Sequence, residues 1–187
     1  MTVRCMRIHE TTLSGVKVLE LKAYEDDRGY FKETYRTTWS DDLGLVSDFV
    51  QDNISRSYQG TIRGLHYQKE QPQAKLIQCI SGSILDVAVD LRKKSSTFGQ
   101  YYSVVLTEKN HKQLYIPEGF AHGFSVLSDQ AIVHYKCSRF HNKATERGIR
   151  WDDPLIHIDW EISKPILSDK DRHLPLFSSL KEEDIFL

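Results

Sequence analysis

Short apolar or alternating segments, separated by turn residues, dominate the first 140 residues of the chain. Runs of this length, bounded by Gly, Pro, Asn and Ser, predict β-strands. Many short strands in succession favour an all-β sandwich or barrel of the jelly-roll type. The predicted strands cover 16–21, 30–36, 49–55, 61–68, 74–80, 84–92, 100–107, 112–117, 123–128 and 131–138.

Helical character is confined to two short stretches. One is TTWSDDLGL (37–45), in the N-terminal third, and the other is LSDKDRHL (167–174), near the C-terminus. Ser168 or Asp169 could cap the second helix. The tail from Trp160 onward is expected to pack irregularly against the barrel.

A turn signal separates two of the predicted strands. Ser-Gly-Ser at 81–83 lies between 74–80 and 84–92. Because Gly tolerates the backbone conformations of tight turns, this spacing predicts a hairpin.

Length and charge limit what the chain can be. Its 187 residues suit one domain, 1–187, and a net charge of −1 argues against a nucleic-acid partner. There is neither a long apolar run nor a signal-peptide pattern, so no membrane association is expected. Three widely spaced cysteines predict reduced thiols and a cytoplasmic protein.

PEGFAHGF (117–124) fits P-x-G-x-x-H, which resembles the second motif of the cupin family of small β-barrels. In metal-dependent cupins this His, here His122, is a ligand, together with an upstream H-x-H. The upstream strand RGLHYQ has only His66, and a third ligand would have to come from elsewhere, such as Glu70. Two protein ligands make an incomplete metal site, so no metal is predicted.

Without a metal, His66 suits acid–base chemistry near neutral pH, or it simply satisfies a buried carbonyl group. A catalytic His needs a partner that orients its ring, usually a carboxylate. Spacing leaves four candidates open, namely Asp86, Asp90, Asp169 and Asp171.

Polar side chains from separate strands converge near His66. Arg63 is three residues away, so strand alternation puts it on the opposite face or at a bend. Lys75 and Tyr135 belong to two other predicted strands. Because such groups are costly to bury together, they predict a site for an anionic, oxygen-rich ligand.

The stretch EDDRGYFKE (25–33) has two interpretations. Its Asp-Arg-Gly sequence is typical of a solvated turn. Alternatively, Arg28 beside Tyr24, Tyr30 and Phe31 could bind a phosphate next to a stacked base.

From about residue 17 to 176, the chain resembles the dTDP-4-dehydrorhamnose 3,5-epimerase family. The motifs that carry the resemblance stand in the family's order: DDRGYFKE, FVQDNIS, IRGLHYQ, QAKL, DVAVDLRKKSSTFGQ, QLYIPEGFAHGFSVLSD, YKCS, ERGIRWDDP and PILSDKD. The resemblance implies a homodimer of cupin-like jelly-roll barrels without metal or cofactor. It also implies inversion of C-3 and C-5 of dTDP-4-dehydro-6-deoxy-D-glucose to give dTDP-4-dehydro-L-rhamnose.

The resemblance also implies roles for particular residues. His66 matches the catalytic base, Asp171 the carboxylate that pairs with it, and Tyr135 the acid on the opposite face. Lys75 and His122 match residues that favour the enolate oxygen. The matched nucleotide-sugar contacts, some of them supplied in the family by the neighbouring subunit's N-terminal segment, are Arg28, Glu33, Gln51, Asp52, Asn53, Arg63, Glu146 and Lys170.

One position departs from the family's pattern. After YKC the family usually has two adjacent tyrosines, and this chain has Phe140 and His141. The second of these matches the residue that stacks on thymine, a role that His141 could fill with less area. Two alternatives therefore stay open: an epimerase of a single centre, at C-3 or C-5, and, further off, a metal-dependent cupin. A binding module without catalysis has no need of an acid and a base on opposite faces.

Overall fold

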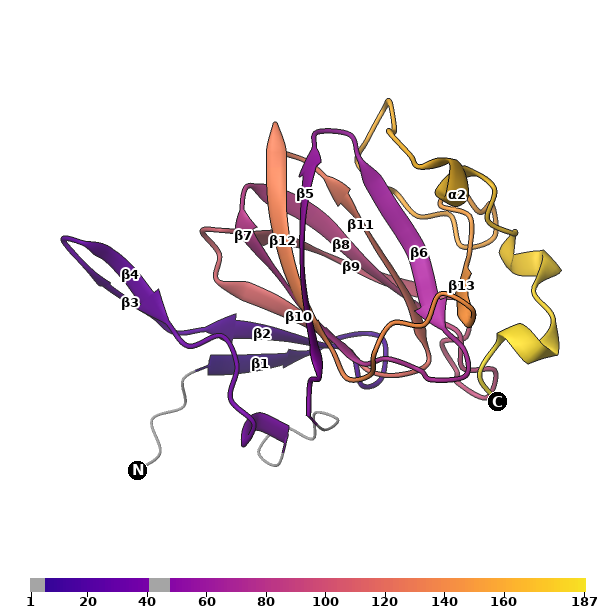
Figure 1. Ribbon diagram of the computed structural model, residues 1–187, viewed down its shortest axis with the longest axis horizontal. Helices are drawn as coiled ribbons and strands as arrows, with labels where there is room; N and C mark the ends of the chain where they lie inside the picture. The colour runs from indigo at the N-terminus through magenta and orange to yellow at the C-terminus, as the bar shows by residue number, and fades with distance from the viewer. Residues whose placement is uncertain (1–5, 41–47) are drawn as a thin grey trace.

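Two antiparallel sheets pack face to face in the computed structural model, which describes residues 6–40 and 48–187 (Figure 1). One sheet has the strand order β1-β2-β10-β7-β12-β5 and the other β13-β6-β11-β8-β9. A small third sheet, β3-β4, projects from the barrel (Figure 1). The strands are β1 (Met6–Glu10), β2 (Lys17–Leu21), β3 (Ala23–Asp26), β4 (Gly29–Lys32), β5 (Gln51–Tyr58), β6 (Ile62–Gln68), β7 (Lys75–Ser81), β8 (Ser83–Asp90), β9 (Tyr101–Thr107), β10 (Lys112–Ile116), β11 (Phe120–Val126), β12 (Gln130–Cys137) and β13 (Glu146–Gly148).

This architecture confirms the predicted all-β, jelly-roll class. Side chains that alternate along the strands fill the space between the two sheets, as a barrel requires. On β12, for example, Ala131 and Val133 are buried in this core. The core also includes Ile77, Leu114 and Phe124 from other strands of both sheets.

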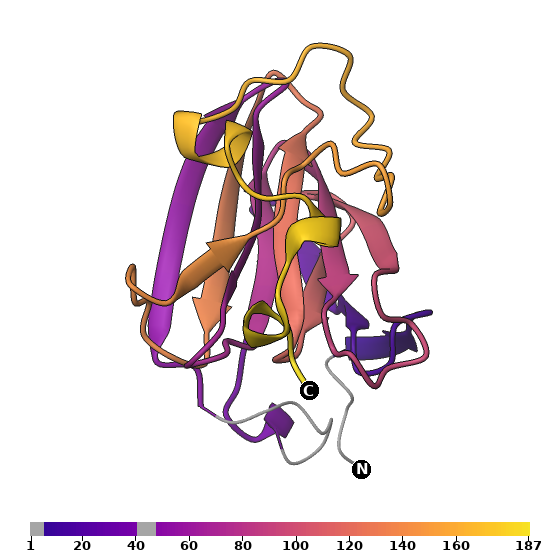
Figure 2. The ribbon, with the colours of Figure 1, turned by 90° about the vertical axis from the view of Figure 1, so that its right-hand side faces the viewer.

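A second apolar layer covers the outer face of the five-stranded sheet. Figure 2 shows the C-terminal part of the chain running across this face. Trp160, Ile156 and the partly buried Phe186 pack there against strand residues such as Val87. The tail is therefore part of the core. It also forms two short 3-10 helices, Phe177–Ser179 and Glu182–Asp184, which the sequence did not predict.

The predicted hairpin at 81–83 is wrong. β7 pairs with β10 and β12 in one sheet, whereas β8 pairs with β11 and β9 in the other. Gly82, with φ of +82°, turns the chain from one sheet to the other. A Cβ at this position would lie 2.2 Å from the Gln130 carbonyl oxygen, so glycine is required. Alternation along a strand does not reveal which sheet the strand joins.

The C-terminal helix is confirmed, although it is shorter than predicted. α2 spans Asp169–Arg172, and the Ser168 hydroxyl caps it by accepting from the Asp171 N–H. Asp169 is therefore in the first turn rather than at the cap. Of the helix predicted over 37–45, residues 37–40 form a turn and the first helical residues, and 41–45 lie outside the described residues. No helix in the described part of the chain is long and apolar enough to cross a membrane.

Candidate active site

A cleft of about 550 Å³ opens between the two sheets. Its walls come from β5, β7 and β12 on one side and from β6 and β11 on the other, and the segment 166–171 borders it. The lining residues are Ser55, Arg56, Ser57, Tyr58, Thr61, Ile62, Arg63, His66, Lys75, His122, Phe124, Tyr135, Ile166, Leu167, Ser168, Lys170 and Asp171. Half of the residues predicted for the site therefore meet in one cavity.

His66 on β6 pairs with Asp171 on α2. The His66 Nε2 lies 2.6 Å from the Asp171 Oδ1, and this contact selects Asp171 from the four candidate carboxylates. Burial raises the pKa of the Asp171 carboxyl, but hydrogen bonds from His66 and Ser168 outweigh it and leave the pKa below its ordinary value. An ionised Asp171 holds the proton on Nε2, which leaves Nδ1 free to accept a proton.

His122 on β11 has a carboxylate partner of its own. Its Nε2 lies 2.7 Å from the Oδ1 of Asp86, which is fully buried on the neighbouring strand β8. Burial lowers the pKa of His122, and the nearby Lys75 and His66 lower it further, against the opposing effect of Asp86. His122 is therefore a neutral donor or acceptor rather than a cation at neutral pH.

Lys75 begins β7 and is partly buried in the cleft. Burial lowers the pKa of its ammonium, while the charges of Cys137, Asp86 and Glu146 act in the opposite direction. An ammonium in such a setting is poorly solvated, so it interacts strongly with negative charge that develops nearby.

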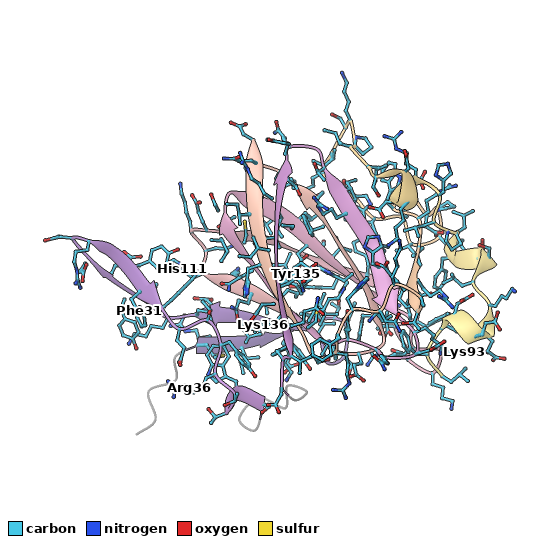
Figure 3. All side chains as sticks on the ribbon, in the orientation of Figure 1. Phe31, Arg36, Lys93, His111, Tyr135 and Lys136 are labelled. Atoms are coloured by element: carbon cyan, nitrogen blue, oxygen red, sulfur yellow. The ribbon has the colours of Figure 1, made fainter. Side chains whose placement is uncertain are left out.

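Tyr135 on β12 lies on the wall opposite His66, since β12 and β6 belong to different sheets. Figure 3 shows Tyr135 inside the barrel. Burial raises the pKa of its phenol, so the group keeps its proton at neutral pH and can donate it. A proton acceptor and a proton donor thus face each other across the cleft.

Arg63 lines the same cleft as His66, although the two residues are three positions apart. The pairing of β6 with β11 shifts between His122↔His66 and Phe124↔Arg63, so β6 has one extra residue there. Gly64 lies in this bulge with φ of +126°, and a Cβ on it would come within 2.5 Å of the Gly123 Cα. The predicted bend is therefore confirmed, and a glycine makes it possible.

Glu146, on β13, joins two predicted residues at the edge of the site. Its Oε2 lies 2.5 Å from the Nζ of Lys170 and 3.6 Å from the Nε2 of His141. Burial raises the pKa of the Glu146 carboxyl, but Lys170, His66 and His141 outweigh it and lower the pKa below its ordinary value. The Glu146 carboxyl is thus ionised at neutral pH and lies beside the cleft.

The remaining predicted residues do not line the cleft in this chain. Arg28 lies on the projecting β3-β4 hairpin, where it pairs with Asp26, and Figure 3 labels the neighbouring Phe31 there. Asp52 points to the outer face of its sheet and binds the Lys136 Nζ at 2.8 Å. The others are held elsewhere by protein contacts: Glu33 by Arg36, Gln51 by the His141 N–H, and Asn53 by Gln51.

The potential metal ligands that the structure describes are not arranged around a common point. Among the described residues, no group of three or more His, Cys, Asp or Glu is placed to hold a metal ion. Glu70, the third ligand considered, is exposed and does not line the cleft. The Nε2 atoms of both histidines instead contact carboxylates.

Several lining residues were missed by the sequence analysis. Among them are Ser55 and Ser57 on β5, Ser168, which caps α2, and the charged Arg56. A signal for the first two was present, because they continue the alternation of Gln51 and Asn53 along QDNISRS.

A jelly-roll barrel that holds an imidazole–carboxylate pair on one wall and a phenol on the other is an acid–base enzyme of the cupin type. The model of the dTDP-4-dehydrorhamnose 3,5-epimerase family matches residues 10–179, and the chain belongs to this family.

Individual relatives agree over nearly their whole length. A dTDP-4-dehydrorhamnose 3,5-epimerase from Methanothermobacter thermautotrophicus is 46% identical, covering 97% of this chain and 98% of the relative. The crystal structure of a dTDP-6-deoxy-D-glucose-3,5-epimerase from Legionella pneumophila, in complex with dTDP-4-keto-L-rhamnose, has a TM-score of 0.94 at 42% identity and covers 97% of both chains. A 3′-monoepimerase from Streptomyces bikiniensis, in complex with dTDP-quinovose, has a TM-score of 0.86 at 32% identity, covering 91% of this chain and 88% of that one.

Proposed function

We propose that this chain is a dTDP-4-dehydrorhamnose 3,5-epimerase, which converts dTDP-4-dehydro-6-deoxy-D-glucose to dTDP-4-dehydro-L-rhamnose. The observation that carries the proposal is the His66–Asp171 pair on one wall of the cleft, with Tyr135 on the other. Inversion at carbon needs a base and an acid on opposite faces of a sugar ring, and this cleft supplies both.

His66 is the proposed base. Its Nδ1 takes the proton from the carbon next to the ketone. The electron pair of that C–H bond forms a C=C bond, and the π pair of the ketone moves onto its oxygen to give the enolate. The Lys75 ammonium stabilises the negative charge on this oxygen, which lowers the barrier to proton removal. His122 contacts the sugar beside it. Asp171 keeps the imidazole in the tautomer that can accept.

Tyr135 is the proposed acid. Its phenol gives a proton to the opposite face of the same carbon, which inverts the centre. The phenolate then regains a proton from solvent, and His66 releases its own. The same cycle at the second carbon completes the double inversion.

Nucleotide binding first involves two of the cationic side chains that line the cleft. Arg63 and Lys170 line it, and both suit phosphate or carbonyl oxygens. Glu146, Gln51, Asn53 and His141 extend the site beyond the cleft. Asp52 contacts substrate only if its ion pair with Lys136 opens.

A homodimer would account for the distance of Arg28 and Glu33 from the cleft. The hairpin that carries Arg28 exposes large aromatic residues, among them Phe31 with 72% of its surface accessible. In a dimer, this hairpin of one subunit would cover the cleft of the other and bring Arg28 to the nucleotide. A cytoplasmic location fits the two buried free thiols of the described residues, Cys79 and Cys137.

Mixing two inactive variants tests this arrangement. Arg28→Ala and His66→Asn, unfolded and refolded together, form mixed dimers in which one site has both native residues. Random assembly then restores about one quarter of the wild-type activity. No recovery in verified mixed dimers would place Arg28 in its own subunit's site, and an active Arg28→Ala variant would place it outside any site.

The reaction itself is tested by incubation with dTDP-4-dehydro-6-deoxy-D-glucose in deuterated water, followed by proton NMR. We expect the signals of both the C-3 and the C-5 protons to disappear. No exchange at either carbon would contradict the proposal.

Loss of the C-3 signal alone would identify an epimerase of a single centre. This second candidate is favoured by His141, which stands where the family pattern has a tyrosine, and by the structural similarity to the 3′-monoepimerase. A change in the stacking residue alters how the base, and with it the sugar, is held.

A further inference from the structure

The inward face of the edge strand β5 is polar along its whole length. Gln51, Asn53, Ser55 and Ser57 occupy alternate positions and are less exposed than the residues between them. A sheet that packs one face on a core normally has the reverse pattern, with apolar residues inside. On β5 the apolar side chain of Ile54 instead faces outward, 72% exposed. A polar inner face beside a cleft therefore indicates contact with a polar ligand.

Ser57 already has a partner within the protein. It is 4% exposed, and its Oγ accepts a hydrogen bond of 2.9 Å from the Nε of Arg63. This contact fixes the orientation of the guanidinium group and leaves its other N–H donors unused by Ser57. The C-terminal end of β5 is thus hydrogen-bonded to a residue of the cleft.

Ser55 lacks such a partner. Its Oγ is buried and makes no hydrogen bond within the described part of the chain. Four other side-chain atoms share this property there, in Tyr67, Gln78, Asp86 and Gln113, and none of those residues lines the cleft. An unpaired buried hydroxyl destabilises the folded protein, so its presence in a binding cleft calls for a partner from outside the chain.

The sheet register places Ser55 next to the reacting groups. Ser55 pairs with Val133, and Asn53 pairs with Tyr135 two positions along the same strands. Ser55 is therefore a diagonal neighbour of Tyr135 on the inner face, a separation that a bound sugar or phosphate can bridge. It lies between Tyr135 and the Arg63–Ser57 pair along the inner face of the barrel.

We propose that Ser55 is a substrate-binding residue whose hydroxyl hydrogen-bonds an oxygen of the nucleotide sugar. The inference rests on the proposed function for the nature of the ligand. The oxygen belongs either to a sugar hydroxyl group or to the diphosphate, since both offer the acceptor that a serine O–H needs. Arg63, held by Ser57, binds the same part of the ligand from the facing wall.

The decisive comparison is between Ser55→Thr and Ser55→Val. The two replacements have nearly the same size and shape, and only Thr keeps a hydroxyl. Calorimetric titration with dTDP-glucose, which has no ketone and does not react, measures binding apart from turnover. We expect the Val variant to bind about 3- to 10-fold more weakly than the Thr variant, the loss of one neutral hydrogen bond.

Titration with dTDP alone identifies the oxygen. If the Thr–Val difference persists with dTDP, the partner is a phosphate oxygen, and if it disappears, the partner belongs to the sugar. The same pair of changes at Ser103, on β9 and outside the cleft, should leave both affinities unchanged. Should either bulkier variant fail to fold, Ser55→Ala compared with the wild type shows the same loss.

Equal affinities of the Thr and Val variants for both ligands would overturn the inference. That result differs from a failure of the proposed ligand class, in which the wild type itself would bind neither dTDP-glucose nor dTDP. The deuterium-exchange experiment separately tests which carbons are inverted.

Discussion

Two histidine–aspartate pairs of nearly equal length each contribute their histidine to one cleft, and their surroundings differ. In His66–Asp171 the histidine side chain is 26% exposed, and its partner lies 105 residues away in the C-terminal segment. In His122–Asp86 both members are buried, on neighbouring strands of one sheet. A partly exposed pair can exchange protons with substrate and solvent, whereas a buried pair holds its protons and contributes a fixed dipole. Exposure, more than hydrogen-bond length, separates the base from its companion.

The largest effect is expected from His66→Asn. General-base catalysis contributes about 10²- to 10⁴-fold, so turnover and deuterium exchange should fall by at least 10²-fold while dTDP affinity stays within a few-fold. His122→Asn changes a residue beside the sugar and leaves the proposed base in place, so it should lose less. Proton NMR in deuterated water measures both variants. If His122→Asn lost exchange completely and His66→Asn retained it, the two assignments would have to be reversed.

Tyr135→Phe separates proton removal from inversion. The base is intact in this variant, so exchange at the carbon next to the ketone should continue at a rate within about 10-fold of the wild type. Product formation should fall much further, since no acid remains on the opposite wall. Integrated NMR signals of substrate and product follow both processes in one tube. Parallel loss of the two would argue against a separate donor.

The carboxylates should differ in their effect on stability. Asp86→Ala leaves the buried His122 Nε2 without its partner, which we expect to lower the free energy of unfolding by about 1–3 kcal/mol. Asp171→Ala should lower it less, because His66 can turn to solvent, and should lower turnover more. Denaturant unfolding and initial rates give the two quantities. A larger stability loss at Asp171 would contradict the comparison.

The smallest effect concerns acid sensitivity. Burial lowers the pKa of His122, so below about pH 6.5 the unfolded chain binds a proton that the folded chain does not. Stability is therefore complete above that pH and declines as the pH falls further. His122→Asn should flatten the decline between pH 7 and 5 by less than about 1.4 kcal/mol per pH unit.

The Asp171 carboxyl affects the stability of the fold in a different pH range from His122. The folded-state pKa of this carboxyl is depressed, so its contribution is present above about pH 4 and is lost as the pH falls through the lower folded value. Asp171→Asn should leave the slope between pH 7 and 5 unchanged. Urea titrations at several pH values compare the two variants, and identical slopes would show that the pairs do not titrate separately.

The sequence predicted those features of the fold that depend on neighbouring residues, above all the strands. Alternation marked most of the strands. It left Arg63 either on the opposite face from His66 or at a bend, and the register shift in the structure selects the bend. Spacing alone could not select Asp171 as the partner of His66, because their contact joins segments 105 residues apart. Nor could it show that β7 and β8 enter different sheets.

The sequence located the strands better than it showed on which face of the sheet each side chain lies. Asp52 was grouped with Gln51 and Asn53, although consecutive residues of a strand point to opposite faces. The alternation that turns Asp52 outward also turns Ser55 inward. β13, with three residues, is too short to leave a pattern, and the strand predicted over 30–36 ends at Lys32.

His66 and Asp171 are 105 residues apart in the chain, and this separation affects the order in which the pair is synthesised. The last barrel strand ends at Gly148, so all the strands and His66 have been synthesised 23 residues before Asp171. At about 5–20 residues per second, a ribosome needs one to several seconds for that interval. During it, the growing chain holds every strand of the barrel and a histidine without its carboxylate. The proposed His66–Asp171 pair can therefore form only after the C-terminal segment has been made and has packed against the barrel.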